Sequence, residues 1–151
     1  MPEINLFLDS SALIAGIISE AGASRVLLLL AESGHITATI SEQVLTECER
    51  AIARKVPQAL GDLRQAILAS RVQIVRDPSL EDVLENRNLI SHAADVPIVL
   101  AAMRAKVDYL VTLNRKHFID DSLVAEKSGL RIGTPGDALD WVRKRMSVED
   151  H

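Results

Sequence analysis

The sequence predicts an α/β fold, a three-layer α/β/α sandwich around a mostly parallel central sheet. Short apolar runs alternate with helical patterns along the whole chain. Strands separated by helices favour parallel pairing, because a parallel neighbour requires a crossover connection. No repeat, linker or change in composition divides the 151 residues, which suit one hydrophobic core. We therefore expect a single domain over residues 1–151.

The first half of the chain contains two strand patterns and four helix patterns. Strands are expected over residues 4–8 and 35–40, and helices over residues 10–19, 23–33, 41–55 and 57–70. Gly34 is a suitable residue to end the second helix, and β-branched residues are frequent in the strand that follows it. Ser41 is a favourable N-cap for the third helix. Strand and helix thus alternate from the start.

The second half continues this alternation. Strands are expected over residues 72–75 and 109–113, with a short edge strand over 130–132, and helices over residues 79–90, 94–106 and from 134 onward. The Asp77-Pro78 pair marks a turn before the first of these helices. The acidic run that ends at Asp121 is expected to cap a further helix rather than to bind a ligand. The last helix carries Trp141, one of only four aromatic residues.

Composition indicates an intracellular globular protein. Hydrophobic residues make up 48% and charged residues 25% of the chain, which excludes disorder as an overall description. Cys48 is the single cysteine, so the sequence offers neither an internal disulfide nor a thiolate zinc site. The chain begins Met1-Pro2-Glu3, without the basic flank of a signal peptide, and its apolar runs are far shorter than the roughly 20 residues of a membrane helix. We expect a cytoplasmic protein with no membrane partner.

The net charge of −4 argues against nonspecific coating of nucleic acid. It still permits an enzyme that acts on nucleic acid, because carboxylates that hold a divalent cation count as negative until the cation binds.

Four oxygen-bearing side chains are expected at one edge of the sheet. Asp9 ends the first strand, and Glu47 lies within two turns of the start of the helix after the second strand. Asp95 precedes the helix that leads into the fourth strand, and Asn114 lies just past that strand. In right-handed βαβ units all these positions belong to the carboxyl edge, where open α/β sheets bind ligands. Clustered carboxylates repel unless a cation joins them, so the pattern predicts a Mg²⁺ or Mn²⁺ site.

Each of these residues also has a purely structural interpretation. A carboxylate at a strand end or a helix start is frequently a cap or a turn former. Glu47, Arg50 and Arg54 share one flank of their helix, which fits either a surface ion pair or a metal ligand beside two phosphate contacts. The spacing alone leaves both interpretations open.

Four segments in order resemble the motifs of PIN-domain proteins, and the resemblance covers the chain from residue 6 to about residue 142. These segments are residues 8–13 (LDSSAL), 41–47 (SEQVLTE), 95–102 (DVPIVLAA) and 108–118 (DYLVTLNRKHF). PIN domains are α/β/α sandwiches, and many small ones are ribonuclease toxins of VapBC-type toxin–antitoxin pairs. The resemblance implies that Asp9, Glu47 and Asp95 bind Mg²⁺ or Mn²⁺, and that metal-activated water cleaves RNA phosphodiester bonds.

The same resemblance assigns supporting roles. Ser11 would orient Asp9 or a water, and Thr112 would support the geometry of the site. Asn114 stands where many members carry a fourth Asp, so the expected catalytic set of Asp9, Glu47, Asp95 and Asn114 has one charge fewer, and a second metal is in question.

Basic residues at the same edge are candidates for RNA contacts. They are Arg50, Arg54, Arg115 and Lys116, each with the alternative of an ordinary solvated surface position. The histidines at 35, 92, 117 and 151 are scattered, and the mechanism needs none of them as a base; His117 is near the edge. The resemblance further implies a homodimer and a cognate antitoxin protein as partners.

Two other α/β folds fit the sequence less well. A haloacid dehalogenase-like phosphatase requires Asp-x-Asp after the first strand, whereas this chain has Asp9-Ser10-Ser11. A receiver domain would need an acidic pair there and an acceptor Asp after the third strand, where Val75 is instead followed by Arg76. The alternative to the ribonuclease is a catalytically degenerate PIN-like module that binds RNA or a protein, for which Asn114 is the support.

Overall fold

The computed structural model describes residues 4–149. The expectation about a signal peptide depends on Met1-Pro2-Glu3, which lies outside these residues, and His151 also lies outside them. Five strands form one sheet in the order β3-β2-β1-β4-β5, and all four neighbouring pairs are parallel. The strands are β1 (Asn5–Leu8), β2 (Thr37–Ser41), β3 (Gln73–Val75), β4 (Tyr109–Val111) and β5 (Ile132–Gly133).

Helices connect every strand to the next along the chain, and a last helix follows β5. They are α1 (Ser10–Ile18), α2 (Ala23–Glu32), α3 (Glu42–Lys55), α4 (Leu60–Ala69), α5 (Leu80–Glu85), α6 (Val96–Arg104), α7 (Ser122–Ser128) and α8 (Pro135–Glu149). Three short segments complete the chain: the 3-10 turns η1 (Pro57–Ala59) and η2 (Ala93–Asp95), and the π-helical segment η3 (Arg115–Ile119).

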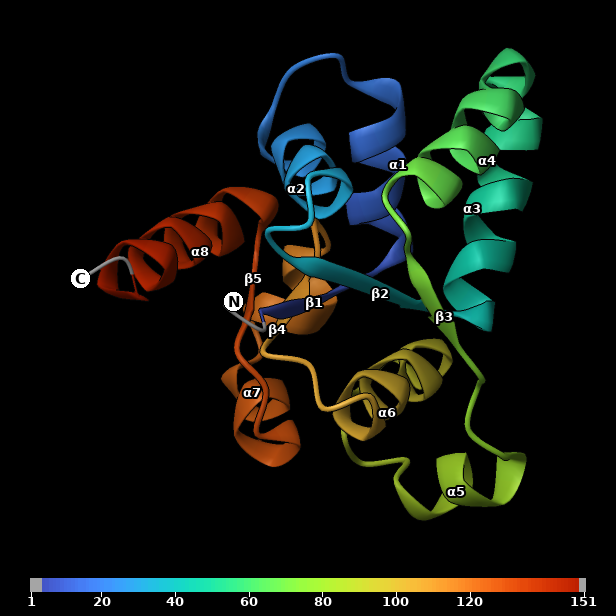
Figure 1. The fold of residues 1–151 in the computed structure, drawn as a ribbon. Coiled ribbons are helices and arrows are strands. Elements are labelled where there is room, and N and C mark those ends of the chain that lie inside the picture. Colours follow the sequence, from blue (N-terminus) through green and yellow to red (C-terminus); the bar gives the residue numbers. More distant parts are fainter. Residues whose placement is uncertain (1–3, 150–151) are drawn as a thin grey trace.

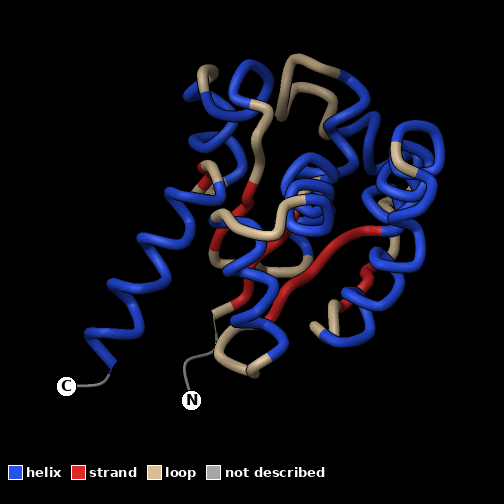
Figure 2. Tube along the Cα trace, turned by 90° about the horizontal axis from the view of Figure 1, so that it is seen from above, coloured by secondary structure: helices blue, strands red, loops and turns tan. Residues whose placement is uncertain are grey.

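The sheet lies between two helical layers (Figure 1). Helices α1 and α2 cover one side, and α6 covers the opposite side. The view turned by 90° shows the strands enclosed by helices, and in both views α8 extends beyond the sheet toward the C-terminus (Figure 2). This arrangement confirms the predicted α/β/α fold class, and the sheet is parallel throughout its described strands.

The central strands are apolar on both faces because helices cover both faces. Leu6 and Phe7 of β1, and Leu110 and Val111 of β4, have no exposed surface. Strands β1 and β4 are neighbours, although long stretches of sequence separate them. The order of strands reverses between them, so their carboxyl ends form the position where such sheets bind ligands.

Several boundaries differ from the sequence prediction, most of them by one to three residues. Helix α5 ends at Glu85 rather than near residue 90, because the Asn86 side chain donates to the carbonyl of Asp82 and turns replace the last helical turn. The turns bring Leu89 and Ile90 into the core. The edge strand is Ile132–Gly133 rather than 130–132.

The segment after β4 also differs. The strand stops at Val111, and η3 forms a π-helix that the sequence pattern does not indicate. As expected, Asp121 caps α7, since its side chain accepts a hydrogen bond from the amide of Leu123. Within residues 4–149 no single helix is long and apolar enough to cross a membrane. Helices α1 and α2 together have the length and apolar composition of a membrane span, but they are bent by 87° relative to each other.

Candidate active site

Asp9 is a buried carboxylate at the carboxyl end of β1. It is 4% exposed, and it is also the N-cap of α1. Its Oδ1 accepts hydrogen bonds from Ser11 Oγ at 2.7 Å and from the amide of Ala12 at 3.0 Å, and its Oδ2 accepts one from Thr112 Oγ1 at 2.5 Å. A carboxylate has about four lone-pair positions, so one remains for a further partner.

Burial raises the pKa of Asp9 above its usual range. The hydrogen bonds from Ser11, Thr112 and Ala12 oppose this rise, and the negative charge of Asp95 adds to it. Among residues 4–149 no positively charged side chain takes part in this balance. Asp9 is therefore a buried acid beside a second acid, which is an environment that favours a bound cation.

Thr112 and Ser11 connect Asp9 to the loop after β4. The Thr112 hydroxyl is fully buried and accepts a hydrogen bond from the amide of Asn114 at 2.9 Å while donating to Asp9. The Ser11 hydroxyl accepts one from the amide of Leu113 at 3.0 Å while donating to Asp9. Both hydroxyls thus fix the Asp9 carboxylate and the loop together.

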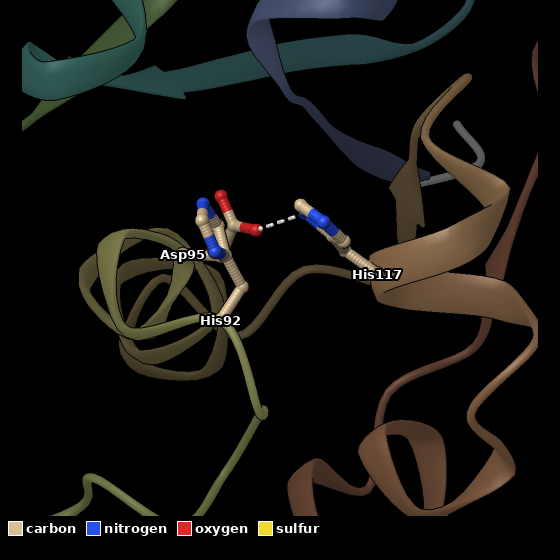
Figure 3. Close-up of side chains that lie close together, drawn as sticks. All are labelled: His92, Asp95 and His117. Atoms are coloured by element: carbon tan, nitrogen blue, oxygen red, sulfur yellow. Dashed lines mark hydrogen bonds and ion pairs between the residues drawn. The ribbon is translucent and has the colours of Figure 1, made fainter.

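Asp95 begins helix α6 but does not cap it. It occupies the N-cap position without a side-chain hydrogen bond to the helix, and Pro97 in the first turn has no amide hydrogen to offer. Its Oδ2 lies 3.0 Å from Nδ1 of His117 instead. Figure 3 shows His117 extending from η3 toward Asp95 across the space between the two segments.

Glu47 lies on α3 and is half-buried. Its Oε2 accepts a hydrogen bond from Gln43 Nε2 at 3.2 Å, and the same amide donates to the carbonyl of Ala94 at 3.0 Å. Gln43 therefore ties Glu47 to the residue that precedes Asp95. The sequence analysis missed Gln43, and its position four residues before Glu47 is the signal that could have indicated it.

Cys48 is a buried thiol close to both Asp9 and Glu47. Burial raises the pKa of its thiol to about 12, and the negative charges of Asp9, Glu47 and Glu49 contribute. The charges of Asp9, which directly follows β1, and of Glu47 on α3 therefore both reach this one thiol, as expected for residues at a common edge of the sheet.

Asn114 caps the π-helical segment. Its Oδ1 accepts a hydrogen bond from the amide of His117 at 3.2 Å, and its Nδ2 lies 3.0 Å from Nδ1 of the same residue. Both polar atoms of the Asn114 side chain therefore contact His117, and the His117 ring in turn contacts the carboxylate of Asp95.

The four basic candidates are all exposed. Arg50 and Arg54 form no ion pair among residues 4–149, so the described part of the chain does not contain the surface ion pair with Glu47. Arg115 and Lys116 are the first two residues of η3. A groove of about 390 Å³ lies beside Arg115, and Arg25 lines it as well. Arg25 was not singled out, because it lies in α2, far from every motif.

The donor set fits a hard divalent ion such as Mg²⁺. Glu47 Oε1 and Asp95 Oδ1 accept no hydrogen bond from residues 4–149, so both are available as ligands. The oxygens of the three acids do not all lie within 4.8 Å of one another; among residues 4–149 the group that does is His92, Asp95 and His117. Mg²⁺ keeps several waters and commonly binds only one or two carboxylates directly, so this wider spacing suits it.

Comparisons with known proteins place this geometry in a family. A PIN-domain model matches residues 5–116. PAE2754 from Pyrobaculum aerophilum has a TM-score of 0.64 at 16% identity, over 93% of this chain and 90% of its own. VapBC2 from Rickettsia felis, bound to a DNA fragment from their promoter, has a TM-score of 0.58 at 24% identity, over 87% of this chain and 98% of that chain. No curated protein matches the sequence.

At these identities the two solved structures are similar in fold alone. The family model, however, covers most of the chain and includes Asp9, Glu47, Asp95 and Asn114. The chain belongs to the PIN-domain family.

Proposed function

We propose that this protein is a divalent-metal-dependent endoribonuclease that hydrolyses RNA phosphodiester bonds. The observation that carries the proposal is Asp9, a buried carboxylate held by three hydrogen bonds beside Asp95. Among residues 4–149 no cationic side chain neutralises it. Such a group destabilises the metal-free protein, so its position is better explained by ion binding than by folding.

Asp9, Glu47 and Asp95 would hold the ion. A bound Mg²⁺ or Mn²⁺ would supply charge neutralisation on the phosphate and would activate a water for attack. Ser11 and Thr112 keep both Asp9 oxygens in place, so the carboxylate does not have to reorganise during the reaction. Asn114 acts by positioning, because its amide is engaged by His117.

The RNA would lie along the groove beside Arg115. This residue and Arg25 line the groove and provide positive charge for phosphates in a protein of net charge −4. Lys116, Arg50 and Arg54 are exposed and available for further phosphate contacts.

The test is cleavage of a labelled structured RNA with Mg²⁺ or Mn²⁺, with EDTA, and with two variants, Asp9→Asn and Asp95→Asn. Asp140→Asn is the matched control, since Asp140 is an exposed residue of α8 that pairs only with Lys144 among the described residues. We expect metal-dependent cleavage that both site variants lose and the control keeps.

Equal cleavage by the wild type and both site variants would reveal a contaminating nuclease and refute the proposal. No cleavage of several RNAs, together with a rise in melting temperature on adding Mg²⁺ or Mn²⁺, would favour the degenerate binding module instead. The capping role of the Asn114 amide is the observation that favours this second candidate.

We further propose a cognate antitoxin as partner and a homodimer as the assembly. The support is the similarity of fold to VapBC2 from Rickettsia felis. Co-expression with the neighbouring gene product, followed by size-exclusion chromatography with light scattering, tests both. A purely monomeric protein that captures no neighbouring gene product would refute them.

A further inference from the structure

Two histidines and an aspartate form a compact cluster at the edge of the nuclease site. One potential ligand atom from each of His92, Asp95 and His117 lies within 4.8 Å of the other two. His92 lies beside Asp95, and His117 faces both from the other side (Figure 3). The two imidazole rings have centroids 4.3 Å apart and are inclined by 36°.

The fold holds two of the three residues in place. Asp95 begins α6, whose residues from Val96 to Ala102 are almost all buried. His117 is held by the Asn114 cap and by Phe118, which is 2% exposed in the core. His92 is exposed and lies just before η2, so its side chain is free to adjust. The cluster therefore combines two fixed ligand positions with one adaptable position.

We propose that His92, Asp95 and His117 bind a borderline transition-metal ion of the Zn²⁺ class. Two imidazoles and one carboxylate are a ligand set used by open transition-metal sites, whereas Mg²⁺ prefers oxygen ligands alone. The side chains of Asp95 and His117 are 14% and 31% exposed, so an ion and its waters can enter.

The observed distances suit one ion. Ligand atoms about 2.1 Å from an ion lie about 3.0 Å apart at a right angle and about 4.2 Å apart on opposite sides. Asp95 Oδ2 and His117 Nδ1 are already 3.0 Å apart. The ligand atom of His92 lies within 4.8 Å of the other two, close to the widest separation that one ion allows.

Hydrogen bonding around His117 also points to a missing partner. Its Nδ1 lies 3.0 Å from the Asn114 amide nitrogen, a donor, and 3.0 Å from the Asp95 carboxylate, an acceptor. One imidazole nitrogen either donates or accepts, so it cannot satisfy both neighbours. A cation between Nδ1 and Asp95 removes the conflict with the carboxylate, because both atoms then direct lone pairs toward the ion. The Asn114 amide nitrogen then no longer donates to Nδ1, and Asn114 stays in place through its Oδ1, which accepts from the His117 amide.

This inference goes beyond the proposed ribonuclease. The ion class differs, and of the three ligands only Asp95 belongs to the set proposed for Mg²⁺. His92 has no part in the proposed nuclease, so binding at the histidines can be measured and altered separately.

The experiment measures metal binding directly on the tag-free, metal-stripped full chain. Co²⁺ serves as a spectroscopic probe through its visible absorption, and Zn²⁺ displaces it in competition. The wild type is compared with His92→Asn, with His117→Asn, and with the control His35→Asn, which changes an exposed histidine in the turn between α2 and β2. Thermal melts verify that each variant is folded.

We expect one Co²⁺ per chain, displaced by Zn²⁺ and not by an equal concentration of Mg²⁺. His92→Asn should weaken binding at least about tenfold while His35→Asn leaves it unchanged. Unchanged affinity in His92→Asn, equal losses in His92→Asn and His35→Asn, or no stoichiometric binding by the wild type would each overturn the proposal. Mg²⁺-dependent RNA cleavage should persist in His92→Asn; absence of cleavage in every sample would refute only the proposed ribonuclease.

Discussion

Thr112→Val tests the hydrogen-bond network that holds Asp9. The Thr112 hydroxyl donates to Asp9 Oδ2 at 2.5 Å and accepts from the Asn114 amide at 2.9 Å, and the residue is fully buried. Valine has nearly the same shape but no hydroxyl. The substitution therefore removes two hydrogen bonds without opening a large cavity.

The expected loss of stability follows from these two contacts. A hydrogen bond to a charged group contributes about 1.5–3 kcal/mol, and the amide of the half-buried Asn114 adds about 1 kcal/mol when it loses its acceptor. The total is about 3 kcal/mol. For a chain of this size each kcal/mol lowers the melting temperature by about 2–4 °C, so we expect a decrease of about 9 °C.

The effect of Thr112→Val should depend on pH. Burial raises the folded-state pKa of Asp9 above its unfolded value, so ionised Asp9 lowers stability. This penalty is absent below the unfolded pKa and complete above the folded pKa. The Thr112 hydrogen bond reduces the penalty, so the stability difference between wild type and Thr112→Val is greatest at neutral pH and narrows as pH falls through the folded pKa.

Urea unfolding followed by circular dichroism at several pH values measures this difference. Thr112→Ser is the control, because it keeps the hydroxyl and loses only a methyl group, with an expected cost of about 1 kcal/mol. Equal destabilisation by serine and valine, or a difference that does not change with pH, would refute the role assigned to the hydroxyl.

Three further predictions concern buried positions. Asp9→Asn should abolish any rise in melting temperature on adding Mg²⁺, because it removes the charge of the buried acid beside Asp95; a rise as large as that of the wild type would contradict this. Cys48 should resist thiol reagents in the folded protein at neutral pH and react fully in urea, since it is buried and its thiol pKa is about 12; rapid labelling without urea would count against its burial. Gly16→Ala should lower the free energy of unfolding in urea by about 1–3 kcal/mol, because the new Cβ would lie 2.6 Å from Leu28 Cδ1. The control Gly61→Ala, with open space around the new methyl group, should be neutral or stabilising. Equal effects of the two substitutions would disprove the close packing of α1 on α2.

The sequence was sufficient to place Asp9, Glu47 and Asp95 at one edge because each is attached to a strand end or a helix start. The direction of a parallel strand and the right-handed crossover then determine the edge, whatever the loop conformations are. The parallel sheet follows from the same alternation of elements, and the structure confirms it.

The histidine cluster could not be predicted in this way. His92 and His117 lie in irregular segments, one before a 3-10 turn and one in a π-helix, where no period relates sequence position to direction. The early end of α5 has a similar origin, because the hydrogen bond from the Asn86 side chain to the backbone competes with the helix.

The sequence left two roles open for each acid, helix capping and ligand binding. The structure shows that Asp9 is a helix cap whose geometry also allows ligand binding, whereas Asp95 is not a helix cap. Asp9 caps α1 through Oδ1, and the same hydrogen bond fixes its carboxylate for a second role. Asp95 occupies an N-cap position and makes no cap, which leaves its side chain directed at His117. An acid at a helix start that forgoes its cap gives up about 1 kcal/mol of helix stability, so Asp95 is the residue whose position folding alone explains least.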